Sequence, residues 1–243
     1  MESHSARRRL TPSRRRSNCA NRSITTCDLR LPTCGCYPKL LNMEGLPRHQ
    51  CLIYGGSPAP YLSSLARIIQ KKLEANFRCL YFNSPAMVAG IRSYLAATGI
   101  NVAREVDSGH LVLSSSQDHL LDGSFVVERM LITLEDSATE AISDGYKGLF
   151  ATGDMTWEFG ATKDFSKLLD YEWALEELFR RQPALCGICQ YHSDTLPPQA
   201  MADALQVHQA IFINETLSRL NPRYGGHRSE PFTHSEAPGP AAL

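Results

Sequence analysis

The chain has 243 residues, of which 43% are hydrophobic, 25 are basic and 25 are acidic. This length and composition fit one domain with a sizeable buried core, flanked by tails. The apolar runs are only a few residues long, far short of the about 20 residues that span a bilayer, and no secretory signal is evident. These features exclude an integral membrane protein, and we expect a cytoplasmic protein with no membrane partner.

The zero net charge conceals a division between the N-terminal segment and the rest of the chain. Residues 1–42 contain nine basic residues against two acidic ones, whereas the remainder contains sixteen basic and twenty-three acidic residues. An acidic body argues against nucleic acid as its main partner. Residues 1–42 lack apolar periodicity and are predicted to be a disordered basic leader. Three interpretations stay open: a basic arm, a solvated tail, and a leader from a start codon placed too early, with Met43 as the true start.

Strand and helix patterns alternate between the tails, which predicts a three-layer α/β fold with a mostly parallel sheet and helices on both faces. Apolar runs predict strands at 51–54, 78–82, 101–103, 110–113, 147–152, 184–191 and 210–213. Apolar residues at helical spacing predict helices at 85–98, 125–143, 164–181 and 198–207, and one that carries Leu62, Leu65, Ile69 and Leu73. We place the domain at residues 43–217 and a disordered tail, rich in Pro, Gly and His, at 218–243.

This element order is typical of a RecA-like fold, in which the loop after the first strand would be the phosphate-binding P-loop. When G-x-x-x-x-G-K-[ST] is aligned with residues 56–63, only Gly56 and Ser63 match, and Leu62 stands in place of the Lys. Pro58 and Pro60 also lack the backbone N–H groups that would hold a phosphate. We therefore predict that the protein does not hydrolyse ATP and is not an enzyme.

A candidate site follows the predicted strand at 147–152. Asp154 and Trp157 come directly after this strand, and ligands of open α/β sheets bind outside the carboxyl ends of the strands. In the next helix, Glu172 falls on the apolar face, where a carboxylate must be paired, hydrogen-bonded or protonated. Two interpretations stay open. In the first, the helix packs obliquely and Glu172 lies at the rim of the core or bonds to a nearby backbone N–H; in the second, Glu172 shares one pocket with Asp154 and Trp157. In that pocket its pKa would be raised, unless a charged His or a metal offset the effect.

Cysteine and histidine spacing gives no support for a metal site. Cys186 and Cys189 form a C-x-x-C inside a predicted strand, where side chains three residues apart point to opposite faces, so we predict buried structural thiols. Four further cysteines lie within residues 1–42 at spacings that do not fit zinc. A site built from His49, His208, Asp154 and Glu172 is an alternative that no His-x-x-x-His spacing supports. We predict no metal and no cofactor, and we interpret the other histidines, at 110, 119 and 192, as capping or surface residues.

Several segments resemble one known family when they are taken together and in order. They are GYKGLFATGDMTW at 145–157, DYE at 170–172, LCGICQY at 185–191 and His208, preceded by HQCLIY at 49–54, RCLYF at 78–82, GHL at 109–111 and LDGSF at 121–125. The set resembles the MEDS domain, a sensory domain of methanogen and methylotroph signalling proteins and of dichloromethane-responsive transcription regulators. Two positions depart from that family: Asp154 stands where Glu is more usual, and His192 stands where an Asp usually follows CQY.

The resemblance implies a RecA-like fold with a degenerate P-loop, a sensory function, and a ligand that is a small organic molecule or hydrocarbon derivative. The residues that we assign to ligand binding are His49, Tyr54, Asp154, Trp157, Glu172, Tyr191 and His208. Family members often carry a helix-turn-helix or kinase module, for which we find no counterpart, so we expect output through a separate signalling or regulatory protein or a homo-oligomer. The alternatives are a RecA-like nucleotide-binding ATPase without a standard P-loop, and an interaction scaffold that binds no ligand.

Overall fold

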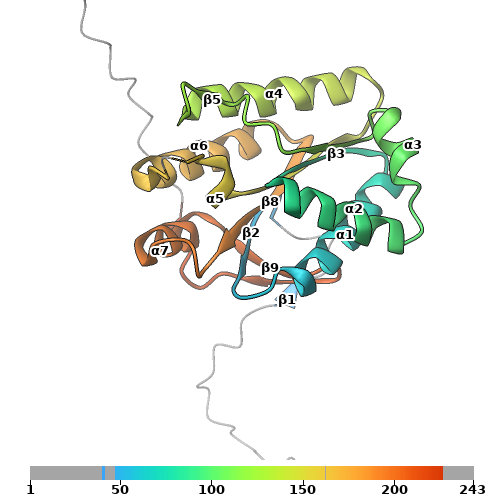
Figure 1. Cartoon of the computed structure of the whole chain (residues 1–243). Coiled ribbons are helices and arrows are strands. Elements are labelled where there is room, and N and C mark those ends of the chain that lie inside the picture. The colour runs from blue at the N-terminus through green and yellow to red at the C-terminus, as the bar shows by residue number, and fades with distance from the viewer. Residues whose placement is uncertain (1–39, 42–46, 162, 227–243) are drawn as a thin grey trace, which may run out of the picture. The chain divides into compact units, whose positions relative to one another are not determined.

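The computed structural model describes residues 40–41, 47–161 and 163–226, and its central feature is an eight-stranded sheet (Figure 1). The strand order is β1-β10-β9-β2-β8-β7-β3-β4. The strands from β9 to β4 are parallel, whereas β10 is antiparallel to β9 and β1 is antiparallel to β10. The strands are β1 (Leu40–Leu41), β2 (His49–Tyr54), β3 (Phe77–Phe82), β4 (Leu111–Ser114), β7 (Gly148–Asp154), β8 (Leu185–His192), β9 (Ala210–Asn214) and β10 (Leu217–Leu220).

Helices cover both faces of the sheet. The helices are α1 (Ala59–Glu74), α2 (Pro85–Ala97), α3 (Val102–Asp107), α4 (Val127–Ser143), α5 (Met155–Glu158), α6 (Leu168–Arg181), preceded by the 3₁₀ turn η2 (Phe165–Lys167), and α7 (Pro198–Val207). A separate hairpin is formed by β5 (Leu120–Leu121) and β6 (Ser124–Phe125). Among the described helices, none combines the length and the hydrophobicity that a bilayer crossing requires. The three-layer, mostly parallel α/β architecture predicted from the sequence is confirmed.

Two hydrophobic cores lie on opposite faces of the sheet because neighbouring strand residues point in opposite directions. The first core packs α4, α6 and α7 against residues such as Cys51 and Tyr191, and the second packs α1, α2 and α3 against residues such as Leu52 and Ile188. The central strand β7 is buried along its whole length. Strands buried on both faces explain the almost continuous apolar runs in the sequence.

One predicted element is wrong in type. The sequence predicts a short strand at 101–103, but Val102–Asp107 form helix α3. The side chain of Asn101 accepts a hydrogen bond from the backbone N–H of Arg104 and so caps this helix. The helix is too short for an apolar periodicity to be visible in the sequence. The capping Asn is the remaining local sign of a helix start.

The predicted C-terminal boundary at residue 217 is also wrong. Residues 217–220 form β10, which pairs with β9, and the buried side chain of Ser218 donates a hydrogen bond to Gln50. The predicted leader overlaps the sheet at its end, because Leu40 and Leu41 pair with β10. The predictions for residues 1–39 and for residues 227–243 lie outside the described part of the chain.

Candidate functional site

The carboxyl ends of the central strands surround a cleft of about 440 Å³. Its lining includes Tyr54 at the end of β2, Asp154 at the end of β7 and Trp157 in α5, together with His192 at the end of β8 and Asn83 after β3. All of these positions follow from the parallel arrangement, which brings the carboxyl ends of the strands to one edge of the sheet. The volume lies within the range of about 300–1,000 Å³ that small-molecule sites occupy.

Asp154 is held in place from two sides. One carboxylate oxygen accepts a hydrogen bond from the hydroxyl of Tyr54 at 2.9 Å, and the other accepts from the backbone N–H of Trp157 at 2.9 Å. The second bond caps helix α5, so strand, turn and helix fix the carboxylate together. Burial raises the pKa of Asp154, and burial together with the charge of Asp154 raises the pKa of Tyr54.

His192 lines this cleft, although its position in the sequence predicts a capping or surface residue. Its ring meets the ring of Tyr54 edge-on, with centroids 4.8 Å apart, and its Nε2–H donates to the carbonyl of Gly56 at 3.2 Å. The sequence signal for this placement is the position of His192 at the end of a strand, as for Tyr54 at the end of β2. The register of β2 and β8 pairs Tyr54 with His192 directly.

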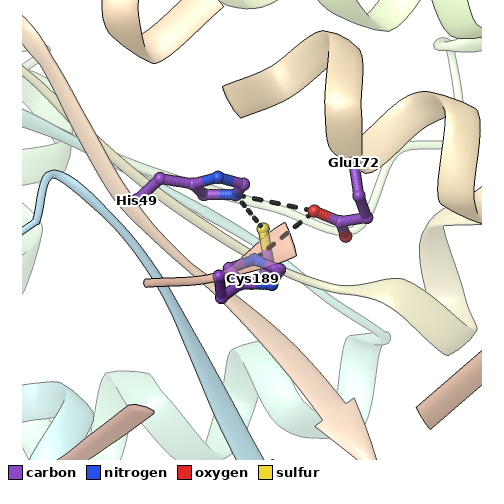
Figure 2. Close-up of side chains that lie close together, drawn as sticks. His49, Glu172 and Cys189 are labelled. Atoms are coloured by element: carbon purple, nitrogen blue, oxygen red, sulfur yellow. Dashed lines mark hydrogen bonds and ion pairs between the residues drawn. The ribbon is translucent and has the colours of Figure 1, made fainter. Parts of the chain in front are cut away.

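A second group of polar side chains is buried beneath α6 and α7 rather than in the cleft. It consists of His49, Glu172, Cys189 and His208, whose potential ligand atoms all lie within 4.8 Å of one another. Figure 2 shows the His49 ring, the Glu172 carboxylate and the Cys189 sulfur converging from different elements. The Nε2 atom of His49 lies 3.3 Å from the Cys189 sulfur and 3.5 Å from a Glu172 oxygen, and His208 Nε2 lies 3.4 Å from the same oxygen.

Outer partners orient each of these side chains. His49 Nδ1 pairs with the carboxylate of Glu176 at 2.9 Å, and the His49 ring stacks on Phe179 with centroids 4.6 Å apart. His208 Nδ1–H donates to the carbonyl of Ala204 at 2.7 Å. The hydroxyl of Tyr191 donates to one oxygen of Glu172. The remaining Glu172 oxygen, Oε2, and His208 Nε2 have no hydrogen-bond partner among the described residues.

The charges in this buried group compensate one another. Burial alone would lower the pKa of His49, but the nearby carboxylates of Glu172 and Glu176 outweigh burial and raise it. Burial alone would raise the pKa of Glu172, but His208 and His49 outweigh it and lower the pKa. Burial and the neighbouring His49 lower the pKa of His208 to about 4. Neighbouring histidines therefore offset the burial of Glu172, which is the stated exception to the prediction of a raised pKa.

The residues predicted to line a single pocket lie in two different places in the structure. Glu172 faces the core, as one interpretation predicted, and it is completely buried. It does not line the cleft that contains Asp154 and Trp157. The reason is the direction of α6, which runs back from the carboxyl ends of the strands, so that its last turns reach His49 at the start of β2. Tyr191, His49 and His208 accompany Glu172 and not Asp154.

Comparison with known proteins agrees with this architecture. The profile of the MEDS family, described as "MEthanogen/methylotroph, DcmR Sensory domain", matches residues 48–209, so the chain belongs to this family of sensory domains. No curated protein was found to match the chain. The fold is RecA-like, as the sequence analysis predicted.

Two solved structures from Pyrococcus horikoshii are similar in fold. An uncharacterized protein, PH0321, crystallised in complex with an unknown peptide, is 10% identical with a TM-score of 0.52, covering 73% of this chain and 84% of that chain. The KaiC-like protein PH0186, from strain OT3, is 15% identical with a TM-score of 0.48, covering 74% of this chain and 80% of that chain. At such low identity, the first of these similarities concerns the fold alone.

Proposed function

We propose that this MEDS domain senses a small organic molecule or hydrocarbon derivative, which binds in the cleft at the carboxyl edge of the sheet. The observation that supports this proposal most directly is the cleft itself, where Trp157 and Tyr54 provide apolar surface beside the carboxylate of Asp154. An apolar lining with a few fixed polar groups suits a small, partly polar ligand. The signal then passes to a separate signalling or regulatory protein, or to a second copy of this chain.

ATP hydrolysis is not part of the proposed function. The N–H of Gly56, which a P-loop would direct at a phosphate, donates instead to the carboxylate of Asp194 at 2.7 Å. Lys is replaced by Leu62, whose side chain is buried in the core. One backbone N–H of this loop is therefore already bound to a carboxylate of the protein itself, which favours a ligand other than a nucleoside triphosphate.

The proposal can be tested with the fluorescence of Trp157. The chain has two Trp residues, and Trp173→Phe leaves Trp157 as the only reporter. This variant is titrated with a panel of short-chain alcohols, amines, carboxylates and chlorinated methanes, and separately with MgATP. We expect saturable quenching or a spectral shift with at least one organic compound and none with MgATP.

Two further variants assign that signal to the cleft. Asp154→Asn and Tyr54→Phe should weaken the same titration, because the first removes the negative charge from the cleft and the second removes the hydroxyl that donates to Asp154. Thr139→Ala, an exposed change on α4, is the matched control and should leave the titration unchanged. No response to any panel member, together with saturable binding of MgATP, would replace the sensor proposal with the nucleotide-binding alternative.

A further inference from the structure

We infer that His49, Glu172, Cys189 and His208 form a four-ligand zinc site, separate from the proposed ligand cleft. The set was not evident from sequence spacing, because its members come from the start of β2, from α6, from β8 and from the residue between α7 and β9. The site lies inside the layer that joins α6 and α7 to the sheet. It does not depend on the sensory proposal.

Three of the six separations between the ligand atoms match tetrahedral zinc, and all six lie within 4.8 Å. Zinc binds His nitrogen at about 2.0–2.1 Å, carboxylate oxygen at about 2.0–2.2 Å and Cys sulfur at about 2.3 Å. Tetrahedral angles then place neighbouring ligand atoms about 3.3–3.6 Å apart. His49 Nε2 lies 3.3 Å from the Cys189 sulfur and 3.5 Å from Glu172 Oε2. His208 Nε2 lies 3.4 Å from Glu172 Oε2.

The free lone pairs provide a second, independent observation. His208 must carry its proton on Nδ1, because that nitrogen donates to the carbonyl of Ala204. Its Nε2 and Glu172 Oε2 then face each other as two buried acceptors without a donor, which is unfavourable unless a cation lies between them. Protonating both histidines instead would place two positive rings with centroids 4.2 Å apart.

The outer partners are those that metal ligands normally have. Zinc-binding histidines usually donate their other N–H to a carboxylate or a backbone carbonyl. His49 has Glu176 in this role and His208 has the carbonyl of Ala204. Tyr191 holds the non-coordinating oxygen of Glu172 and leaves Oε2 for the metal. This arrangement presents four preoriented ligands to one point.

The ligand types favour zinc with a structural role. Two imidazoles, one carboxylate and one thiolate suit Zn²⁺ better than Mg²⁺ or Ca²⁺, which prefer oxygen ligands only. Four protein ligands leave no open coordination position, as in structural rather than catalytic zinc sites. On binding, Cys189 loses its thiol proton and protonated His49 loses its Nε2 proton, both to solvent, and the two positive charges of Zn²⁺ balance the thiolate and the Glu172 carboxylate. The metal would thereby connect β2, β8, α6 and the start of β9.

The experiment uses the full chain with Cys19, Cys27, Cys34 and Cys36 replaced by Ser, so that zinc bound by those four cysteines is not counted. Because the four proposed ligands are almost completely buried, the protein is unfolded in guanidinium with a chelator, desalted, and refolded with ZnCl₂. We expect one zinc per chain, and X-ray absorption spectroscopy of the unaltered site should find one sulfur and three nitrogen or oxygen neighbours.

Variants of the ligands and of matched residues complete the test. Cys189→Ser and His208→Gln should lower zinc affinity more than the outer-sphere variant Glu176→Gln, for which about a 10- to 100-fold loss is expected. Cys79→Ser is the control, because its buried sulfur lies in the core on the opposite face of the sheet and contacts the carbonyl of Ile69. Circular dichroism verifies folding of each variant.

The inference is overturned if the refolded protein holds less than a tenth of an equivalent of zinc. It is also overturned if the absorption spectrum contains no sulfur neighbour, or if folded Cys189→Ser and His208→Gln bind zinc as well as Cys79→Ser does. The absorption measurement needs no variant, so a failure of the variants to fold does not prevent a decision.

Discussion

Replacing Glu158 with Gln tests whether a carboxyl group buried next to both parts of the site is uncharged. The Glu158 side chain is 4% exposed, and one of its oxygens accepts a hydrogen bond from Tyr171 at 3.3 Å. Burial raises its pKa well above the ordinary value of 4.5, and the negative charges of Glu172 and Asp154 raise it further. Gln has nearly the same shape, and its amide oxygen can accept the same hydrogen bond.

The sign of the pH dependence follows from proton counting. In the unfolded chain the carboxyl group ionises near a pKa of about 4.3, whereas the folded chain keeps its proton to much higher pH. Between these two pKa values the native state binds one proton more, so the free energy of unfolding of the wild type decreases by about 1.4 kcal/mol per pH unit. Gln does not titrate. The free energy of unfolding of Glu158→Gln should therefore increasingly exceed that of the wild type as the pH rises from the unfolded-state pKa towards the folded-state pKa.

Urea denaturation followed by circular dichroism at pH 5, 6, 7 and 8 measures this difference. Near the unfolded pKa the two proteins should have similar free energies of unfolding, and Glu158→Gln should become the more stable at each higher pH. Glu128→Gln, an exposed change on α4, serves as the control and should differ from the wild type by a nearly constant amount. If the curves for Glu158→Gln and wild type are parallel from pH 5 to 8, the carboxyl group is ionised in the folded protein and the reasoning fails.

Three other predictions concern a glycine beside Glu158, the side-chain cap of α3 and the hydrolysis of ATP. Gly153→Ala should destabilise the fold, because a Cβ there would lie 1.8 Å from an oxygen of Glu158; thermal melting should show that combining it with Glu158→Ala recovers part of the loss, and no recovery would contradict the proposed clash. Asn101→Ala should cost about 0.5–2 kcal/mol in urea denaturation through loss of the α3 cap, and an unchanged midpoint would show that the cap is dispensable. Purified protein should release no phosphate from MgATP above the buffer blank, whereas release that Ser63→Ala abolishes would show ATPase activity.

The repeating elements could be predicted because their signals are local. The strands of the central sheet are buried on both faces and therefore have continuous apolar runs, and α4, α6 and α7 have apolar residues at helical spacing. The missed elements have short or unusual signals. Strand β10 has only four residues, and it is held largely by pairing with β9. Such pairing comes from residues distant in sequence, which a local pattern does not contain.

The cleft could be predicted better than the buried cluster. Asp154 and Trp157 follow a buried strand within three residues, so their place at the carboxyl edge is nearly independent of the remaining topology. Glu172 lies in the following helix, and its position depends on the direction in which that helix crosses the sheet. The short connection between the strand and the helix predicts that Glu172 stays beside Asp154. Helix α6 instead carries it over β2 and β8, where it meets His49 and Tyr191.

Sheet order, rather than ligand spacing along the chain, brings the proposed zinc ligands together. Strand β2 lies between β9 and β8, so a histidine that starts β2, a histidine just before β9 and a residue in β8 can meet although they are far apart in sequence. Parallel register pairs His49 with Gly187, and alternation then turns Cys189, two residues later, to the same face as His49. Motif rules for zinc describe ligands within one or two local segments. In such a sheet, the informative pattern is therefore a His at or just before the start of each of two adjacent strands and a Cys in a third strand whose side chain points to the same face. An acidic residue on the apolar side of the helix that covers this face completes the set.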